Sequence, residues 1–269
     1  MLINIEDDFS LDKIARSGQC FRSCLVNDSH RFITEENVIY IRQIKEHGFE
    51  ISSDYAVFEK IWRPYFDLNR NYNSIIESIE DPFLSLAARN GAGIRILKQN
   101  AWEMVITFII SQRKSIPAIA KSVEELCRRY GTEIQTDYEC LYAFPTPEQL
   151  ALATQEELKQ CSLGYRVPYI LDAVQKVCTN EINLIELANS DDSTMLMELK
   201  KIKGIGDKVA NCIMLFAYAR TASVPIDTWI QKIIEHKYNG NNPFTAYGDN
   251  AGILQQYAFY YVQQNKISF

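Results

Sequence analysis

A glycine-containing segment followed by a lysine carries residue types and a spacing that could do chemistry. Residues 199–213 read LKKIKGIGDKVANCI, so Gly204 and Gly206 separate two helix-like stretches and Lys208 lies in the first turn of the second. Glycines permit a tight turn, and the unpaired amides at a helix N-terminus attract phosphate without sequence preference. Taken alone, the segment fits a phosphate-binding hairpin and an ordinary helical hairpin with a basic surface equally well.

A carboxylate follows this segment closely. Residues 224–228 read VPIDT, in which Asp227 has the pattern of a helix N-cap. A neutral lysine amine is a nucleophile, and the positive end of a helix disfavours the ammonium form. A nearby carboxylate can stabilise a developing cation and move protons. The alternatives are a solvated lysine and a purely structural cap, and these two residues alone do not decide between them.

The order of hairpin, lysine, apolar helix, V-P-x-D and helix resembles the helix-hairpin-helix DNA glycosylase superfamily. Further segments resemble the 8-oxoguanine DNA glycosylases within it: residues 17–22 (SGQCFR), 65–68 (YFDL), 94–99 (IRILKQ) and 163–166 (LGYR). The resemblance extends from about residue 15 to residue 262. The hairpin, Lys208, Asp227 and residues 17–22 together make it specific.

This resemblance implies a bifunctional DNA repair enzyme that excises 8-oxoguanine from a duplex. The base would be flipped out of the helix, and Lys208 would attack C1′ with Asp227 as its partner. The resulting Schiff base would undergo β-elimination and nick the strand 3′ to the abasic site. Two alternatives remain: a helix-hairpin-helix glycosylase for another damaged purine, and a non-catalytic DNA-binding protein. Lys208 argues against the monofunctional members, which generally lack that lysine.

The resemblance also implies a base pocket built from four residues. Cys212 and Phe259 would sandwich the flipped purine, Gln255 would read its Watson–Crick edge, and the carbonyl of Gly18 would accept a hydrogen bond from N7–H, which only 8-oxoguanine has. Cys212 lies four residues after Lys208, and Gln255 and Phe259 are also four apart, so each pair shares a helix face. Taken singly, Gly18, Cys212 and Phe259 also fit turn or core positions.

Contacts with DNA are expected from seven residues: Arg113, Tyr165, Arg166, Lys203, Gly204, Gly206 and Trp229. Tyr165 and Arg166 would fill the gap left by the flipped base. Two departures from the family pattern stand out. Ala118 occupies a position where the family often has an arginine that contacts the opposite base, which predicts a less stringent reading of cytosine. Trp229 stands where many members have a phosphate-binding histidine.

Cysteine usage predicts no metal centre. The seven cysteines contain no C-x-x-C pair, which fits reduced thiols in an intracellular protein. Cys20 and Cys24 lack a second ligand pair at zinc spacing. No cysteine follows Cys212, so the iron–sulfur cluster of the endonuclease III branch is expected to be absent. We expect no cofactor, and we leave open a structural cation that bridges the hairpin to a DNA phosphate, as relatives suggest.

Charge and composition are those of a globular protein with an uneven charge distribution. The 269 residues are 47% hydrophobic and 23% charged, with a net charge of −6. Residues 1–94 hold 10 basic and 15 acidic residues, whereas residues 95–240 hold 17 and 18, which leaves room for a local basic face. The chain has no membrane-length apolar run, signal-like start or basic nuclear-import cluster. These absences predict a prokaryotic cytoplasmic location and no membrane. The family resemblance implies double-stranded DNA containing 8-oxoguanine as the partner, and we expect a monomer.

The elements that must position these residues indicate an α+β fold. Residues 1–80 are expected to form a small β-rich N-terminal domain of antiparallel strands, including the run NVIYIR at 37–42. Residues 81–269 are expected to form a helical glycosylase region, with the helix-hairpin-helix at about 193–219 and helical patterning from residue 82 onward. Helix starts are expected at Thr146 and Thr154. Further helices are expected near 102–110, 117–130 (capped by Gly131), 168–180, 193–201, 207–219, 228–238 and 247–264.

Overall fold

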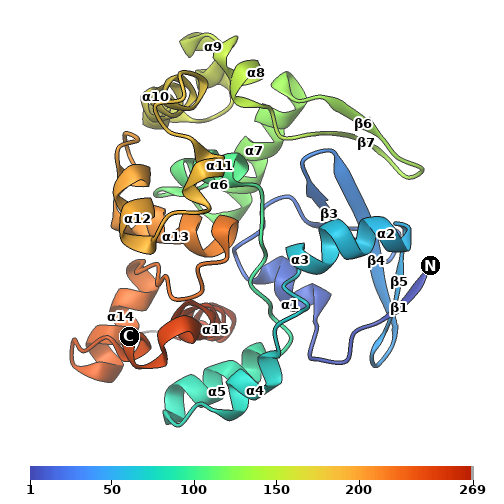
Figure 1. The fold of residues 1–269 in the computed structure, drawn as a ribbon, viewed down its shortest axis with the longest axis vertical. Coiled ribbons are helices and arrows are strands. Elements are labelled where there is room, and N and C mark those ends of the chain that lie inside the picture. Colours follow the sequence, from blue (N-terminus) through green and yellow to red (C-terminus); the bar gives the residue numbers. More distant parts are fainter. Residues whose placement is uncertain (268–269) are drawn as a thin grey trace.

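An antiparallel sheet lies on one side of the molecule and helices fill the other (Figure 1). The structure is a computed structural model that describes residues 1–267. The sheet has the order β1-β5-β4-β3-β2, with the bounds β1 (Leu2–Asn4), β2 (Cys24–Val26), β3 (Ser29–Thr34), β4 (Asn37–Lys45) and β5 (Gly48–Ile51). This confirms the expected antiparallel strands joined by short turns.

Helices begin earlier than the sequence pattern indicated. Helix α1 (Leu11–Arg16) precedes β2, and a continuous helical run follows β5 as α2 (Tyr55–Val57), the π-helical turn η1 (Phe58–Trp62) and α3 (Arg63–Tyr65). The expectation of mainly β structure up to residue 80 is therefore wrong beyond Ile51. The physical reason is the cap and the spacing: Asp54 accepts a hydrogen bond from the Val57 amide, and Phe58, Trp62 and Phe66 recur every four residues.

The sheet and this helical run enclose a small core of their own. The side chains of Phe32, Ile39 and Phe49 from the strands pack in one cluster with Trp62 and Phe66. All five are at most 1% exposed. The helical region has a second, larger core, so the chain is organised around two clusters.

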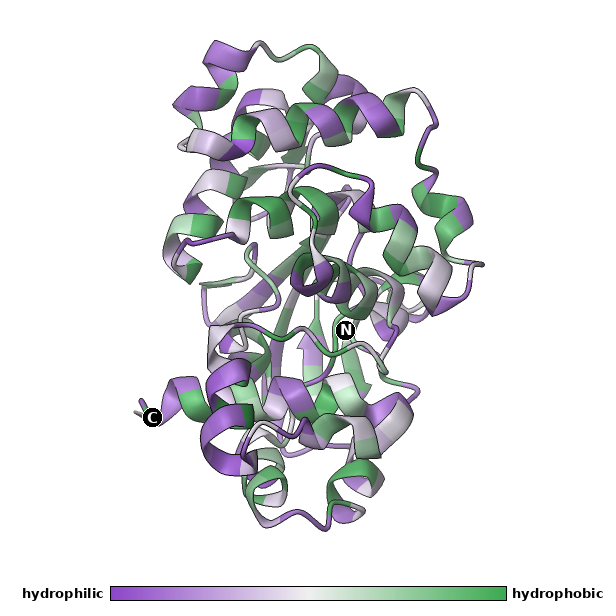
Figure 2. Cartoon of the chain, turned by 90° about the vertical axis from the view of Figure 1, so that its left-hand side faces the viewer, coloured by the Kyte–Doolittle hydropathy of each residue, from purple (hydrophilic) through white to green (hydrophobic). Residues whose placement is uncertain are grey.

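The helical region confirms the expected helices, except that the last α-helix begins at Ala251 rather than at residue 247, because Gly248 has a non-helical backbone. Its elements are α4 (Tyr72–Glu77), α5 (Pro82–Gly91), α6 (Ala101–Ser111), α7 (Ile116–Tyr130), α8 (Pro147–Ala151), α9 (Gln155–Gln160), η2 (Gly164–Arg166), α10 (Val167–Cys178), α11 (Leu184–Leu187), α12 (Asp192–Lys200), α13 (Asp207–Tyr218), α14 (Thr228–Tyr238), η3 (Pro243–Asn250) and α15 (Ala251–Gln264). Outer helices alternate hydrophilic and hydrophobic residues along their length (Figure 2). Within residues 1–267, no helix combines the length and hydrophobicity needed to cross a bilayer.

The caps follow the sequence signals. Thr146 and Thr154 each form a capping box at the start of a helix, as expected. The amide of Gly131 donates to the carbonyl of Cys127 at 2.7 Å, so Gly131 closes α7, with an extended rather than left-handed backbone.

A two-stranded ribbon that the sequence pattern did not indicate reaches from the helical region toward the sheet (Figure 1). Its strands are β6 (Glu133–Gln135) and β7 (Cys140–Tyr142). The ring of Tyr138 at its tip lies 4.5 Å from the ring of Tyr40 on β4, and Glu139 pairs with Arg31 on β3 at 3.2 Å. The ribbon therefore fastens the helical region to the sheet.

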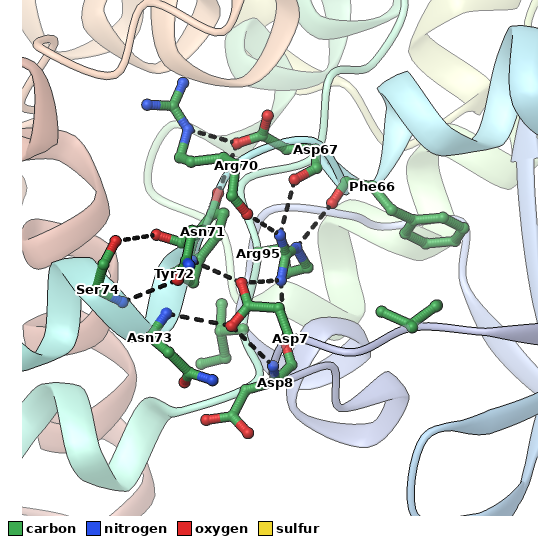
Figure 3. Close-up of polar contacts among 12 residues, drawn as sticks. Asp7, Asp8, Phe66, Asp67, Arg70, Asn71, Tyr72, Asn73, Ser74 and Arg95 are labelled. Carbon is green, nitrogen blue, oxygen red and sulfur yellow. Dashed lines mark hydrogen bonds and ion pairs between the residues drawn. The ribbon is translucent and has the colours of Figure 1, made fainter.

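A buried arginine makes the other connection (Figure 3). Arg95 is fully buried, and its guanidinium donates to the Asp7 carboxylate at 3.0 Å and to four backbone carbonyls. All five of its donors are used. Arg95 thus holds the N-terminal segment against the segment around Phe66 and Asp67. Arg95 itself (94–99) and Phe66 and Asp67 (65–68) lie in two of the stretches that carry the family resemblance.

Candidate active site

Lys208 faces a groove between the hairpin and the start of α7. It is the second residue of α13, whose N-cap is Gly206, so the unpaired amides of that helix open beside it. The groove encloses about 660 Å³. Its floor includes Phe108 of α6, and the ring centroid of Phe108 lies 5.6 Å from the Lys208 ammonium. The sequence analysis singled out Lys208 but missed Phe108, which is one of many buried apolar residues of α6.

Asp227 lies in the same groove and caps α14, as predicted. Its Oδ1 accepts hydrogen bonds from the amides of Trp229 and Ile230, each at 2.9 Å. Burial raises the pKa of this carboxyl, while those two amides and the charge of Lys208 oppose the rise. The capping bonds fix the carboxylate in position, and the electrostatic interaction with Lys208 places both groups in one site.

The four predicted base-pocket residues line one inner pocket beside Lys208 and Asp227. This pocket encloses about 60 Å³, and its lining includes Gly18, Cys212, Gln255 and Phe259. Gln255 is 4% exposed, and its Oε1 is buried with no hydrogen-bond partner among residues 1–267. A buried acceptor of this kind is costly unless something binds it. The structure thus leaves a free acceptor in the pocket.

Two contacts determine the shape of this inner pocket. Gly18 has φ +77°, and a Cβ there would lie 3.1 Å from Cε1 of Phe259, so the phenyl ring rests against the glycine. Gln256, which the sequence analysis did not single out, donates to the carbonyl of Ser17 at 2.5 Å and ties α15 to the glycine turn. Burial raises the pKa of the Cys212 thiol, which also interacts with Lys208.

The hairpin is held from both sides. A Cβ at Gly204, which has φ +83°, would lie 2.4 Å from the Tyr169 ring, whereas a Cβ at Gly206 would meet no atom within 4 Å. Only glycine fits at position 204, because a side chain there would clash with Tyr169. At Gly206 the space in front of the α13 amides is open. The Nε2 of Gln112 donates to the Gly204 carbonyl at 3.0 Å. Gln112 is another site residue that no sequence pattern signalled.

The basic residues around the hairpin are less available than their number suggests. Lys203 lies 3.3 Å from Asp172, and Lys200 lies 2.6 Å from Asp207. The side chain of Lys203 is nevertheless 70% exposed. The hairpin surface therefore presents backbone amides and three exposed lysines, Lys200, Lys201 and Lys203, each of which is paired with a carboxylate.

The two residues expected at the gap in the duplex differ in exposure. Tyr165 is 50% exposed, as a wedge requires. Arg166 is only 5% exposed, and its guanidinium donates to the carbonyls of Leu163 and Gln112. It also stacks 4.4 Å from the Tyr165 ring. Arg166 is thus folded back against the protein, because two backbone carbonyls match its donors.

The remaining predicted contacts line the groove. Arg113 is exposed with φ +54°, and Trp229 is half-buried with the ammonium of Lys232 5.4 Å from its ring. Ala118 lies on α7, in the first turns after Pro117. Among residues 1–267, no group of three or more His, Cys, Asp or Glu residues is arranged to hold a metal ion.

The fold and this site define a helix-hairpin-helix base excision repair protein, and comparison with known proteins agrees. Residues 1–105 match the family model for the 8-oxoguanine DNA glycosylase N-terminal domain, and residues 106–245 match the HhH-GPD superfamily of base excision DNA repair proteins. The chain belongs to the 8-oxoguanine DNA glycosylase family of that superfamily.

Similar proteins extend over most of the chain. An N-glycosylase/DNA lyase of Saccharomyces cerevisiae is 30% identical over 265 residues, covering 87% of this chain and 69% of the yeast protein. A probable N-glycosylase/DNA lyase of Methanothermobacter thermautotrophicus is 26% identical, covering 74% and 73%. The structure of the Clostridium acetobutylicum 8-oxoguanine glycosylase/lyase, bound to DNA with cytosine opposite 8-oxoguanine, superimposes with a TM-score of 0.92 at 32% identity, covering 99% of both chains.

Proposed function

We propose that this protein excises 8-oxoguanine from double-stranded DNA and then nicks the strand 3′ to the abasic site. The observation that carries the proposal is the convergence of three groups on one cavity. Lys208 supplies an amine at a helix N-terminus, Asp227 a fixed carboxylate, and Gln255 a free acceptor. These are a nucleophile, a proton-transfer partner and a base-reading group.

The reaction would begin with attack of the Lys208 amine on C1′ of the damaged nucleotide. The bond to N9 of the base breaks as the new C–N bond forms, and Asp227 stabilises the positive charge that develops on the sugar. Loss of a proton from the amine and opening of the sugar give a Schiff base. Loss of a proton from C2′ then forms the C2′–C3′ double bond and expels the 3′ phosphate.

Recognition of the base would use the inner pocket. The free Oε1 of Gln255 complements the N1–H and N2–H donors of a guanine-type edge, and the Gly18 carbonyl would accept from N7–H. Guanine has an acceptor at N7, so the same carbonyl would repel it. Because the pocket encloses only about 60 Å³, we propose that the ring of Phe259 turns away from Gly18 to admit the purine and then stacks on it opposite Cys212.

DNA would lie across the hairpin and the groove. The amides beside Gly206 would bind a phosphate, with or without a bridging cation on the hairpin carbonyls, and Lys203 and Trp229 would lie beside the backbone. Tyr165 would enter the duplex, and Arg113 would contact the strand opposite. Arg166 reaches DNA only if it releases the carbonyl of Gln112.

Borohydride trapping on duplexes that differ only in the damaged base tests this function. We expect a covalent protein–DNA adduct and base release with 8-oxoguanine, and neither with undamaged guanine. Trapping with an alkylated purine alone would favour a glycosylase for another damaged purine. Binding without any adduct would favour a non-catalytic DNA-binding protein.

We also propose that the protein acts as a monomer in a prokaryotic cytoplasm, without a redox or metal cofactor. The observation that supports a monomer is that the groove, the hairpin and the inner pocket all come from one chain. Sedimentation of the protein with and without duplex DNA tests it, and a dimer that dissociates with loss of activity would contradict it.

A further inference from the structure

A second cavity lies where the start of α6 meets the β3–β4 turn and the segments that flank β7. It encloses about 410 Å³ and shares no lining residue with the groove or the inner pocket. The residues that line it include three glutamates, Glu35, Glu36 and Glu103, and two aromatic residues, Trp102 and Phe144. This volume is within the usual range for sites that bind small molecules.

Glu103 is the unusual group in this cavity. It is 5% exposed, and its carboxylate makes no hydrogen bond or ion pair with any of residues 1–267. The buried guanidinium of Arg22 interacts electrostatically with Glu103 but makes no hydrogen bond to it. Arg22 donates to Glu124 at 3.0 Å and to the carbonyl of Tyr142, and its Nη1 has no hydrogen-bond partner within residues 1–267. A buried carboxylate without hydrogen bonds is costly, so Glu103 is a group in need of a donor.

The rest of the lining determines what kind of donor would fit. No Lys, Arg or His lines the cavity, and Glu35 and Glu36 lie at its mouth. The side-chain amide of Asn100 donates a hydrogen bond to the Glu35 carboxylate at 3.0 Å. The Glu36 carboxylate makes no hydrogen bond within residues 1–267. These carboxylates are not arranged to hold a metal ion. A complementary ligand is therefore an organic cation.

We propose that this cavity binds a small organic cation, a protonated primary alkylamine, with its ammonium group at Glu103 and its alkyl stem against Trp102 and Phe144. An ammonium supplies three donors to the carboxylate oxygens. The indole Nε1 of Trp102 already donates to the carbonyl of Pro145 at 2.9 Å, so its ring remains as an apolar and cation-binding wall. This site is separate from the proposed repair reaction and does not depend on it.

The charge state of Glu103 gives the site a pH dependence. Burial raises the pKa of Glu103 to about 7; Arg22 opposes this, and Glu124 and Glu35 add to it. A primary alkylamine stays protonated throughout this range. Below pH 7 the carboxyl therefore becomes neutral while the ligand keeps its charge, so binding weakens as the pH falls from 8 to 6.

Calorimetric titration of the whole protein with 1-aminobutane at pH 8 tests the proposal. We expect one saturable site, no binding of the neutral analogue 1-butanol at the same concentrations, and weaker amine binding at pH 6. Glu103→Gln should weaken binding more than about tenfold, because it removes one partner of a buried charge pair. Glu36→Gln, at the exposed mouth, should weaken it a fewfold without risk to folding, and Glu77→Gln on α4 should leave it unchanged.

Three results would overturn the proposal. One is equal binding of 1-butanol and 1-aminobutane, which would make the cavity merely apolar. Another is unaltered binding in a folded Glu103→Gln variant, or in Glu36→Gln if Glu103→Gln does not fold. The third is absence of any saturable site in the wild-type protein. None of these results bears on 8-oxoguanine excision, which borohydride trapping measures separately.

Discussion

Gln112 joins the hairpin to the arginine that follows the wedge. Its Nε2 donates to the Gly204 carbonyl at 3.0 Å, and its own carbonyl accepts from the guanidinium of Arg166. The loop after α6 therefore lies between the proposed phosphate-binding turn and the side chain nearest the proposed wedge. Any movement of Arg166 toward DNA must break its bond to Gln112.

This arrangement bears on how the base opposite the lesion is read. Reading cytosine needs donors for its N3 and O2 acceptors; Ala118 supplies none, and Arg166 is held back in the free protein. One missing charged hydrogen bond is worth ~1.5–3 kcal/mol, or roughly one to two decades of discrimination. We expect excision opposite cytosine and, with a reduced penalty, opposite the other bases. Ala118→Arg should sharpen the preference for cytosine.

Single-turnover rates on four duplexes that differ only in the opposite base measure this preference. Lys121→Arg, farther along α7, provides a matched control. A cytosine preference above about a thousandfold in the wild-type protein would mean that other residues replace the missing arginine. Ala118→Arg would then change little.

The pH dependence of base excision should report Asp227. Burial raises the pKa of this carboxyl above the ordinary aspartate pKa of about 3.9. On acidification, Asp227 therefore becomes protonated at a higher pH than an ordinary aspartate does. The rate should therefore fall on the acid side, beginning above the ordinary aspartate pKa. Asp227→Asn should lower the rate by about two orders of magnitude or more and remove this acid limb.

Stability measurements separate this chemical role from capping. Asparagine is as good an N-cap as aspartate, so the free energy of unfolding of Asp227→Asn should lie within about 0.5 kcal/mol of the wild-type value. The free energy of unfolding of Asp227→Ala should be lower by about 1 kcal/mol. Full activity of Asp227→Asn would show that Asp227 acts only as a helix cap and has no part in the reaction.

Gln255 should affect base excision but not strand cleavage at a preformed abasic site. Gln255→Leu keeps the shape approximately and removes the free Oε1, so excision of 8-oxoguanine should slow by roughly ten- to a hundredfold. Lyase activity on an abasic duplex needs no base recognition and should remain near the wild-type rate. Equal losses of rate in both assays would show that Gln255 stabilises the fold rather than recognising the base.

Arg95 should matter for stability rather than for chemistry. Lysine cannot supply the five donors that Arg95 directs at Asp7 and four carbonyls, and a buried charge left partly unpaired is strongly destabilising. Arg95→Lys should lower the free energy of unfolding by roughly 3 kcal/mol and the Tm by roughly 5–10 °C. Arg89→Lys on the exposed side of α5 is the matched control, and equal melting of the two variants would contradict this role.

The sequence predicted local features well and long-range ones poorly. The helix phase placed Lys208 and Cys212 on one face, and the V-P-x-D pattern placed Asp227 at a helix cap, because both follow from residues a few positions apart. The retracted position of Arg166 depends on a carbonyl 54 residues away. Pairing of Lys203 with Asp172 and burial of Glu103 likewise depend on tertiary packing, which composition and spacing do not encode.

Replacement of the nucleophile tests the reaction most simply. Lys208→Gln should reduce both base release and strand nicking by several orders of magnitude while leaving binding of damaged DNA nearly intact, since backbone amides carry the phosphate contacts. Lys121→Gln, exposed on α7, should behave like the wild type. Rates are measured in single turnover on one 8-oxoguanine duplex.

The most direct test of the account is to locate the covalent bond itself. Wild-type protein is trapped with borohydride on an 8-oxoguanine duplex, digested, and the modified peptide is sequenced by mass spectrometry. We expect the sugar remnant on Lys208, the amine that shares a cavity with Asp227 and Gln255. A remnant on another lysine of the groove, such as Lys114, or no adduct despite base release, would contradict the amine-attack mechanism proposed for this site.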